Sequence, residues 1–219
     1  MLFRPAMDNA APDARRRPWF LILALVVCSI LGAGGFIGGT ETVAVYRTTQ
    51  LDTSVRLKDL KEDAHRQDAQ ASVDHLVEVL EQERPKMFPL SVAELILGLA
   101  MFILAAAAMA GRSGARSSLV QIVLVQAALI VGTYVATPKV RWAASDMELT
   151  IRAGELEETG NDPAMVKDTV RRFRQIEPVI TGGVLGGRLL VALLIVVALT
   201  RKRTRAFYEA MSEQRNAES

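Results

Sequence analysis

Four long apolar runs alternate with polar stretches along the chain. The runs cover residues 19–39, 89–110, 118–137 and 179–200, and each has about the 20 residues that an α-helix needs to cross the hydrocarbon core of a membrane. Their only charged residues are Glu94 and Arg188. The pattern predicts an all-α, polytopic membrane protein with four transmembrane helices.

The two long connections, 40–88 and 138–178, are polar but periodic. Mostly apolar or small residues recur in them at alternating spacings of three and four, which is typical of a coiled coil or helical bundle, although the apolar content is imperfect. We therefore expect each connection to form a helical hairpin that continues its spans, and the two hairpins to form an extracytoplasmic four-helix bundle. The predicted contact positions are Tyr46, Gln50, Thr53, Leu57, Leu60, Ala64, Ala69, Val73, Leu76, Leu80, Glu83 and Met87 in the first connection, and Trp142, Leu149, Ala153, Leu156, Val166, Thr169, Phe173, Ile176 and Ile180 in the second.

Local signals place the turns within these connections. Asn161-Asp162-Pro163 predicts a turn in the second, because Asp162 can cap the returning helix and Pro163 suits its first position. Asp68 is the expected counterpart in the first connection. Pro85 and Pro89 are expected to kink the helix that leads into the second span.

Basic clusters at the span ends predict the orientation. Arg15, Arg16 and Arg17 precede the first span, Arg112 and Arg116 lie in the 111–117 turn, and Arg201 opens a basic run after the fourth span. Because such clusters favour the cytoplasmic side, we expect the tails 1–18 and 201–219 and the turn 111–117 to be cytoplasmic. The arginine- and alanine-rich composition favours a bacterial inner membrane.

A shift of 94 residues superimposes the two halves of the chain. It aligns span with span and connection with connection, which indicates a two-fold internal repeat. The matched residues include Gly38 with Gly132, Arg47 with Arg141, Asp52 with Asp146, Asp68 with Asp162, Asp74 with Asp168, Glu83 with Glu177, and Leu95 with Leu189.

The same shift places Glu94 opposite Arg188. A charged side chain within a membrane is costly, about 2.5–3.5 kcal/mol at mid-span, and two opposite charges at one depth would offset much of that cost. The first interpretation is an intramembrane ion pair that fixes the register of the second and fourth spans. Contact with a partner, a lipid headgroup or an aqueous cavity is the second, and an ion or proton path is the third.

Glycines at four-residue spacing mark the first and fourth spans. Such small residues let two helix backbones approach closely, either within the chain or against another subunit. The predicted packing positions are Gly34, Gly35, Gly38 and Gly39, and Gly182, Gly183, Gly186 and Gly187.

The sequence contains no set of residues that identifies a reaction. A single cysteine, Cys28, excludes an intrachain disulfide and a multi-cysteine metal site, and a net charge of +2 argues against nucleic-acid binding. His65 and His75 lie ten residues apart, unlike a helical pair of metal ligands. We therefore expect no catalytic residues, no metal and no cofactor.

The expected function is that of a non-enzymatic membrane scaffold, accessory or assembly protein. Its expected partners are the lipid bilayer and either a second copy of the chain or another membrane protein. Two alternatives stay open: a channel or transporter subunit with Glu94 and Arg188 in its ion path, and a ligand-sensing ectodomain that works with a separate output protein.

Overall fold

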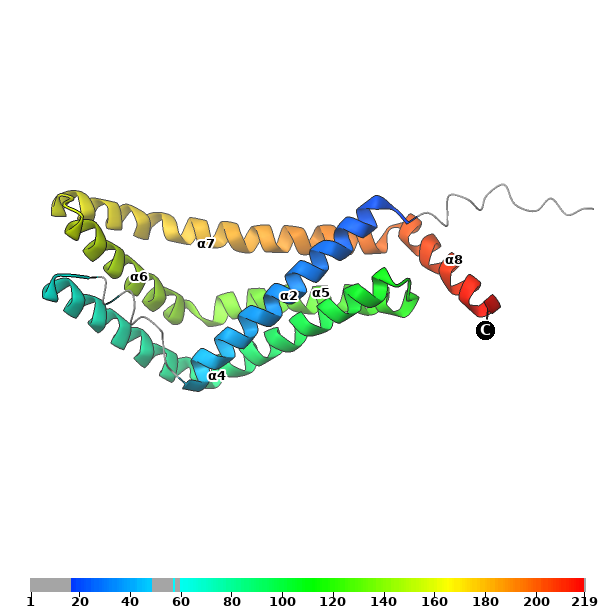
Figure 1. Ribbon diagram of the computed structural model, residues 1–219, viewed down its shortest axis with the longest axis horizontal. Coiled ribbons are helices and arrows are strands. Elements are labelled where there is room, and N and C mark those ends of the chain that lie inside the picture. Colours follow the sequence, from blue (N-terminus) through cyan, green and yellow to red (C-terminus); the bar gives the residue numbers. More distant parts are fainter. Residues whose placement is uncertain (1–16, 49–56, 58–59, 219) are drawn as a thin grey trace, which may run out of the picture. The chain divides into compact units, whose positions relative to one another are not determined.

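The computed structural model describes residues 17–48, 57 and 60–218, and this part of the chain is helical, with no strand (Figure 1). It confirms the all-α prediction. Four of the helices, α2, α4, α5 and α7, are long and apolar enough to cross a membrane. The helices are α2 (Trp19–Thr48), α4 (Asp63–Met109), α5 (Ser113–Ala136), α6 (Pro138–Glu158), α7 (Pro163–Thr200) and α8 (Lys202–Glu218).

The helices contribute to two compact units, which are described separately. The terminal unit consists of Met1–Ile37, Leu95–Ala128 and Arg188–Ser219, and the hairpin unit consists of Gly38–Glu94 and Leu129–Gly187. The long helices α2, α4, α5 and α7 each contribute residues to both.

The terminal unit is built around an apolar core to which α2, α4, α5, α7 and α8 all contribute. Cys28 is fully buried in this core. The backbones of α2 and α4 come very close at Gly32 and Gly98: a Cβ atom added to Gly98 would lie 2.5 Å from the Phe36 nitrogen. Only glycine allows this approach, and neither of these two glycines was among the predicted packing positions.

Within residues 201–219, predicted as a cytoplasmic tail, Lys202–Glu218 form the helix α8. Phe207 and Tyr208 of α8 are buried in the core of the terminal unit, and Met211 packs against it. The signal for this helix was present in the sequence, since Thr204, Phe207, Tyr208 and Met211 follow the three- and four-residue spacing of one helical face.

The turn between α4 and α5 is shorter than the segment 111–117 that the sequence predicts between the second and third spans. α4 ends at Met109 and α5 begins at Ser113. Gly111 has a φ of +79°, a left-handed conformation that favours glycine and often ends helices. Helix α5 therefore begins within the segment 111–117 that the sequence assigned to the turn.

The core of the hairpin unit comes from α2, α4, α6 and the residues around Leu60. One cluster joins Tyr46, Leu76, Leu80 and Met87 to Ala143, and a second joins Leu60, Ala69 and Ile151. Ala64, at the start of α4, is exposed, whereas the other positions predicted on this helix are buried: Ala69, Val73, Leu76, Leu80, Glu83 and Met87. Gln50 and Thr53 lie outside the described residues.

The contact positions predicted on α6 and α7 differ from those observed. α6 buries Ala143, Ile151 and Gly154 rather than Trp142 and Leu156, which are exposed. On α7, Val166 is buried as predicted, whereas Phe173, Ile176 and Ile180 are about half exposed. A heptad pattern identifies a face that favours another helix, but it does not identify which helix covers it.

One of the two predicted hairpin turns is confirmed and the other is wrong. Pro163 is the first residue of α7, and the Asp162 carboxylate accepts the Ala164 N–H at 3.0 Å, so Asp162 caps this helix as predicted. Asp68, in contrast, lies inside α4, which begins five residues earlier at Asp63. No glycine or proline accompanies Asp68, and a lone aspartate is a weak stop signal.

One connection between a span and its hairpin is interrupted at a proline. It is not in α4, which continues as one helix through Pro85 and Pro89, where the kink stays a prediction. The interruption lies at Thr137, which the sequence predicted to continue from span into hairpin, and Pro138 opens α6 there. A proline disfavours the helical conformation in the residue before it, and Thr137 has a non-helical ψ of 37°.

Candidate interaction surface

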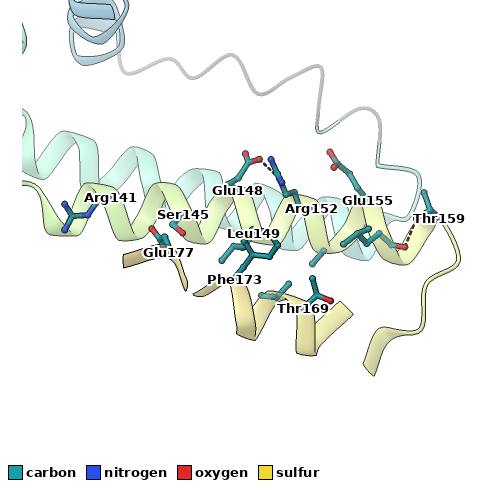
Figure 2. Close-up of a pocket in the computed structure, with 13 residues that line it drawn as sticks. Arg141, Ser145, Glu148, Leu149, Arg152, Glu155, Thr159, Thr169, Phe173 and Glu177 are labelled. Atoms are coloured by element: carbon teal, nitrogen blue, oxygen red, sulfur yellow. Dashed lines mark hydrogen bonds and ion pairs between the residues drawn. The ribbon is translucent and has the colours of Figure 1, made fainter. Parts of the chain in front are cut away.

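A groove of about 760 Å³ lies between α6 and α7 of the hairpin unit (Figure 2). Leu149, Ala153 and Leu156 line it from α6, and Val170 and Phe173 line it from α7. Several of these are predicted contact positions of the second connection. The faces of α6 and α7 that the sequence predicts to pack against each other thus line an open groove.

Polar and charged side chains also line this groove. Several lining residues carry full charges, with both signs present, and a wall of this kind suits an amphipathic protein segment better than a purely apolar ligand. The polar and charged lining residues are Arg141, Ser145, Glu148, Arg152, Glu155, Thr159, Thr169 and Glu177.

An exposed stripe begins at the groove and continues along α7. Starting from Phe173, exposed residues recur at sequence spacings of three and four, as far as Gly187 in the hairpin unit and, at the same sequence spacing, from Leu190 in the terminal unit. We call this stripe the α7 seam. Its members are Phe173, Ile176, Ile180, Gly183, Gly187, Leu190, Leu194 and Val197, and all are exposed.

The α7 seam has the period of a coiled coil. A strict 3.5-residue repeat is the pattern by which two helices wind around each other with a left-handed twist. The predicted contact positions end at Ile180, because the apolar span beyond masks the period. In the described part of α7, only Val166, Ile195 and Leu199 are buried, and none belongs to the seam.

Charged residues flank the start of the seam. If Phe173 occupies heptad position a and Ile176 position d, Arg172 falls at g and Glu177 at e. Arg172 pairs with Asp168 at 2.7 Å, four residues before it on the same helix. Glu177 is only partly exposed and lines the groove. An arginine at g and a glutamate at e are the residue types that pair between coiled-coil helices.

The predicted glycine positions divide into two groups. On α2, a Cβ added to Gly35 would lie 3.5 Å from the Gly98 Cα, so this glycine packs within the chain, whereas Gly34 and Gly38 face open space. Gly39 is buried. On α7, a Cβ added to Gly182, Gly183, Gly186 or Gly187 would meet no described atom within 4 Å. The α7 glycines thus leave room for another helix.

Glu94 and Arg188 belong to different units, and their pairing stays a prediction. Glu94, on α4, is the last residue of its segment in the hairpin unit, and its side chain is partly exposed. Arg188, on α7, opens a segment of the terminal unit and is exposed. Within the described part of its own unit, neither side chain forms an ion pair.

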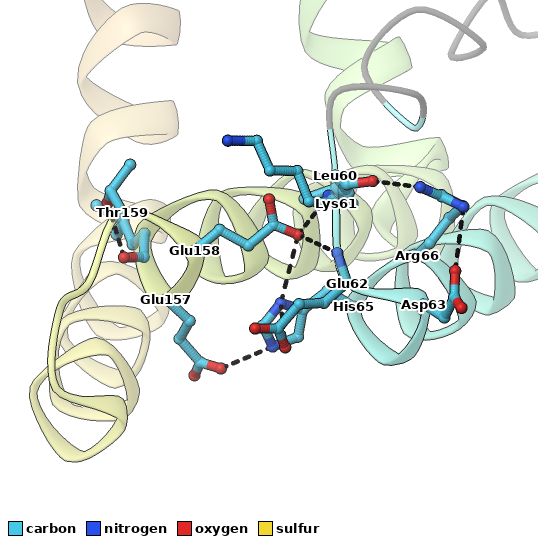
Figure 3. Close-up of polar contacts among 10 residues, drawn as sticks. Leu60, Lys61, Glu62, Asp63, His65, Arg66, Glu157, Glu158 and Thr159 are labelled. Carbon is cyan, nitrogen blue, oxygen red and sulfur yellow. Dashed lines mark hydrogen bonds and ion pairs between the residues drawn. The ribbon is translucent and has the colours of Figure 1, made fainter.

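A polar cluster ties the start of α4 to the end of α6 within the hairpin unit (Figure 3). The Glu158 carboxylate accepts the backbone N–H groups of Lys61 at 2.7 Å and Glu62 at 2.8 Å. These two donors and the nearby His65 hold the pKa of Glu158 below its usual range. His65 Nε2 lies 3.0 Å from Glu157 Oε2. The cluster therefore holds the end of α6 against the residues at the start of α4.

The His65 side chain is largely buried. Three carboxylates surround it, those of Glu62, Glu157 and Glu158. Among the described residues, no group of three or more histidine, cysteine, aspartate or glutamate side chains has the arrangement to hold a metal ion.

Comparisons with protein-family models, with curated proteins and with solved structures gave no match.

Proposed function

We propose that this chain is a non-enzymatic membrane assembly protein that dimerises through the α7 seam. The observation that carries the proposal is a coiled-coil repeat along α7 whose members are all exposed. A helix with this period is suited to another helix, and within each unit the described residues leave these positions exposed. The second copy of the chain is the proposed occupant.

The membrane favours a parallel arrangement of the two α7 helices. Two copies inserted with the same orientation are related by an axis along the membrane normal, so equivalent helices run in the same direction. In a parallel coiled coil, position g of one helix faces position e of the other, five residues later. Arg172 of one copy would then face Glu177 of the other, and the charges are complementary.

The two portions of the seam would contribute differently. Phe173, Ile176 and Ile180 lie close to the polar connection, where burying exposed apolar area from water contributes on the order of 1 kcal/mol per half-exposed side chain. Within a bilayer this gain vanishes, and close packing replaces it. Gly183 and Gly187 would permit that approach. The same stripe therefore suits association in both environments.

The groove between α6 and α7 belongs to the same interface in this proposal. Phe173 and Glu177 line the groove and also lie at positions a and e of the seam. The second copy's α7 would enter the groove at this end and continue along the seam. The two helical hairpins then form an extracytoplasmic helical bundle, built on a two-fold repeat of span, hairpin and span.

Cysteine crosslinking tests the proposed interface. In a Cys28→Ser background, Ile176→Cys is expected to form an intermolecular disulfide in native membranes, because d positions of a parallel pair face each other. Gln175→Cys is the matched control, since residue 175 is exposed but lies off the seam. Equal crosslinking at both positions, or none at position 176, would refute dimerisation through this face.

The proposal places both termini and the α4–α5 turn in the cytoplasm, because the basic clusters flank those ends. Single cysteines at Arg112 and Asn161, in the Cys28→Ser background, are therefore expected to react from opposite sides of the membrane. An impermeant thiol reagent added to intact cells should label the Asn161→Cys variant alone. Labelling of Arg112→Cys from outside would reverse the topology.

A further inference from the structure

A second cavity lies in the terminal unit, where α2 begins and α7 gives way to α8. It has a volume of about 510 Å³ and is lined by Pro18, Trp19 and Phe20 on one side and by Arg201, Lys202 and Arg203 on the other. This size lies within the range of small-ligand sites. Three of the six lining residues are cationic and none is acidic.

Two other arginines of the terminal unit, Arg17 and Arg116, cap the ends of helices within the chain. Arg17 Nη2 donates to the Met109 carbonyl at 2.6 Å, at the end of α4. Arg116 Nη1 donates to the Leu199 carbonyl at 3.2 Å, near the end of α7. Since both bonds satisfy carbonyls that helix ends leave unpaired, these two arginines have structural roles.

The cations of the cavity have no such role in the fold. Arg201 lies over the Phe20 ring, with its Cζ atom 5.2 Å from the ring centroid. Lys202 and Arg203 are exposed, and neither forms an ion pair with a described residue. Like charges gathered around one cavity repel each other, so the cavity is electrostatically suited to an anion.

The cavity lies at the ends of two candidate membrane spans, α2 and α7. Trp19 is 75% exposed. Exposed tryptophans at span ends typically lie at the level of the lipid headgroups, so Trp19 and the cations would meet the bilayer where lipid phosphates are found.

We infer that this cavity binds the phosphate group of an anionic phospholipid. The guanidinium groups of Arg201 and Arg203 match the geometry of phosphate oxygens, and the Lys202 ammonium adds a third charge. Trp19 and Phe20 provide an apolar wall for the glycerol and upper acyl chain. Free phosphate offers the same chemistry, so the test must separate the two sources.

The test measures lipid binding to the full-length protein in a neutral detergent. Phosphatidylglycerol is expected to bind and raise the Tm, whereas phosphatidylcholine should do neither. Each removed cation is expected to weaken phosphatidylglycerol binding about fivefold, so the double variant Lys202→Gln/Arg203→Gln should bind about 25-fold more weakly. The fold should survive, since both side chains are exposed.

Arg205→Gln is the matched control, because Arg205 is an exposed cation of α8 that does not line the cavity. It is expected to change the affinity less than twofold. If inorganic phosphate alone raises the Tm through Lys202 and Arg203, the cavity is a phosphate site with a soluble source. Equal binding of both lipids, an unaffected double variant, or an equal loss in Arg205→Gln would each overturn the inference.

Discussion

Gly98→Ala is expected to destabilise the protein, although alanine normally favours helices. An added Cβ would lie 2.5 Å from the Phe36 nitrogen and 2.7 Å from the Gly35 carbonyl carbon, both of them backbone atoms of α2. Because backbone atoms cannot rotate away as a flexible side chain can, α2 and α4 must move apart. Overpacking of this kind lowers the free energy of unfolding by about 1–3 kcal/mol. For a chain of this size, each kcal/mol lowers the Tm by about 2–4 °C.

Gly34→Ala is the matched control on the facing helix. A Cβ at position 34 meets no described atom within 4 Å, so this substitution is expected to be neutral or to stabilise by about 0.5–1 kcal/mol. Thermal unfolding followed by circular dichroism compares the two variants. Opposite signs are the expected result, and equal Tm values would show that α2 and α4 do not cross at Gly98.

Tyr208→Ala is expected to have the largest effect on stability. The Tyr208 side chain is 2% exposed and packs edge-to-face on Phe207, with ring centroids 5.3 Å apart. Its hydroxyl donates to the Ala108 carbonyl at 2.8 Å, in the last turn of α4. Truncating a buried aromatic side chain to alanine typically costs about 3–5 kcal/mol, and here it would also free α8 from the core.

Two further variants separate the causes of that loss. Tyr208→Phe removes only the hydroxyl and is expected to cost about 0.5–1.5 kcal/mol, since the Gly111 N–H also bonds the Ala108 carbonyl, at 3.0 Å. Glu209→Ala alters an exposed neighbour on α8 and should leave the Tm unchanged. If the Tyr208→Ala variant has the same Tm as the wild-type protein, α8 is not part of the core of the terminal unit.

The parts of the fold that follow from local rules could be predicted from the sequence. Span length depends on hydropathy alone, and the cap at Asp162 with Pro163 depends on two adjacent residues. The partner of each helical face could not be predicted, because that choice depends on the whole core. The face of α6 that contains Ala143 and Ile151 packs toward α4, which leaves Leu149 and Phe173 lining a groove.

The residue spacing of the α7 seam could be predicted from the sequence, but the length of the seam could not. The three- and four-residue spacing identified Phe173, Ile176 and Ile180, but the glycines that follow contribute little to hydrophobic periodicity, and the rest of the span is apolar on every face. Gly183, Gly187, Leu190, Leu194 and Val197 continue the spacing, and all of them are exposed in the structure. Glycines already identified as packing positions thus become part of a longer surface.

The mass of the intact particle most directly tests the proposed dimer. Native mass spectrometry of the full chain, released from lipid nanodiscs, is expected to give twice the chain mass of 23.9 kDa. The variant Gly183→Leu/Gly187→Leu should give a single chain of unchanged helicity, because both positions face open space within the chain. A single wild-type chain, or a dimer that survives this double substitution, would contradict assembly through the α7 seam.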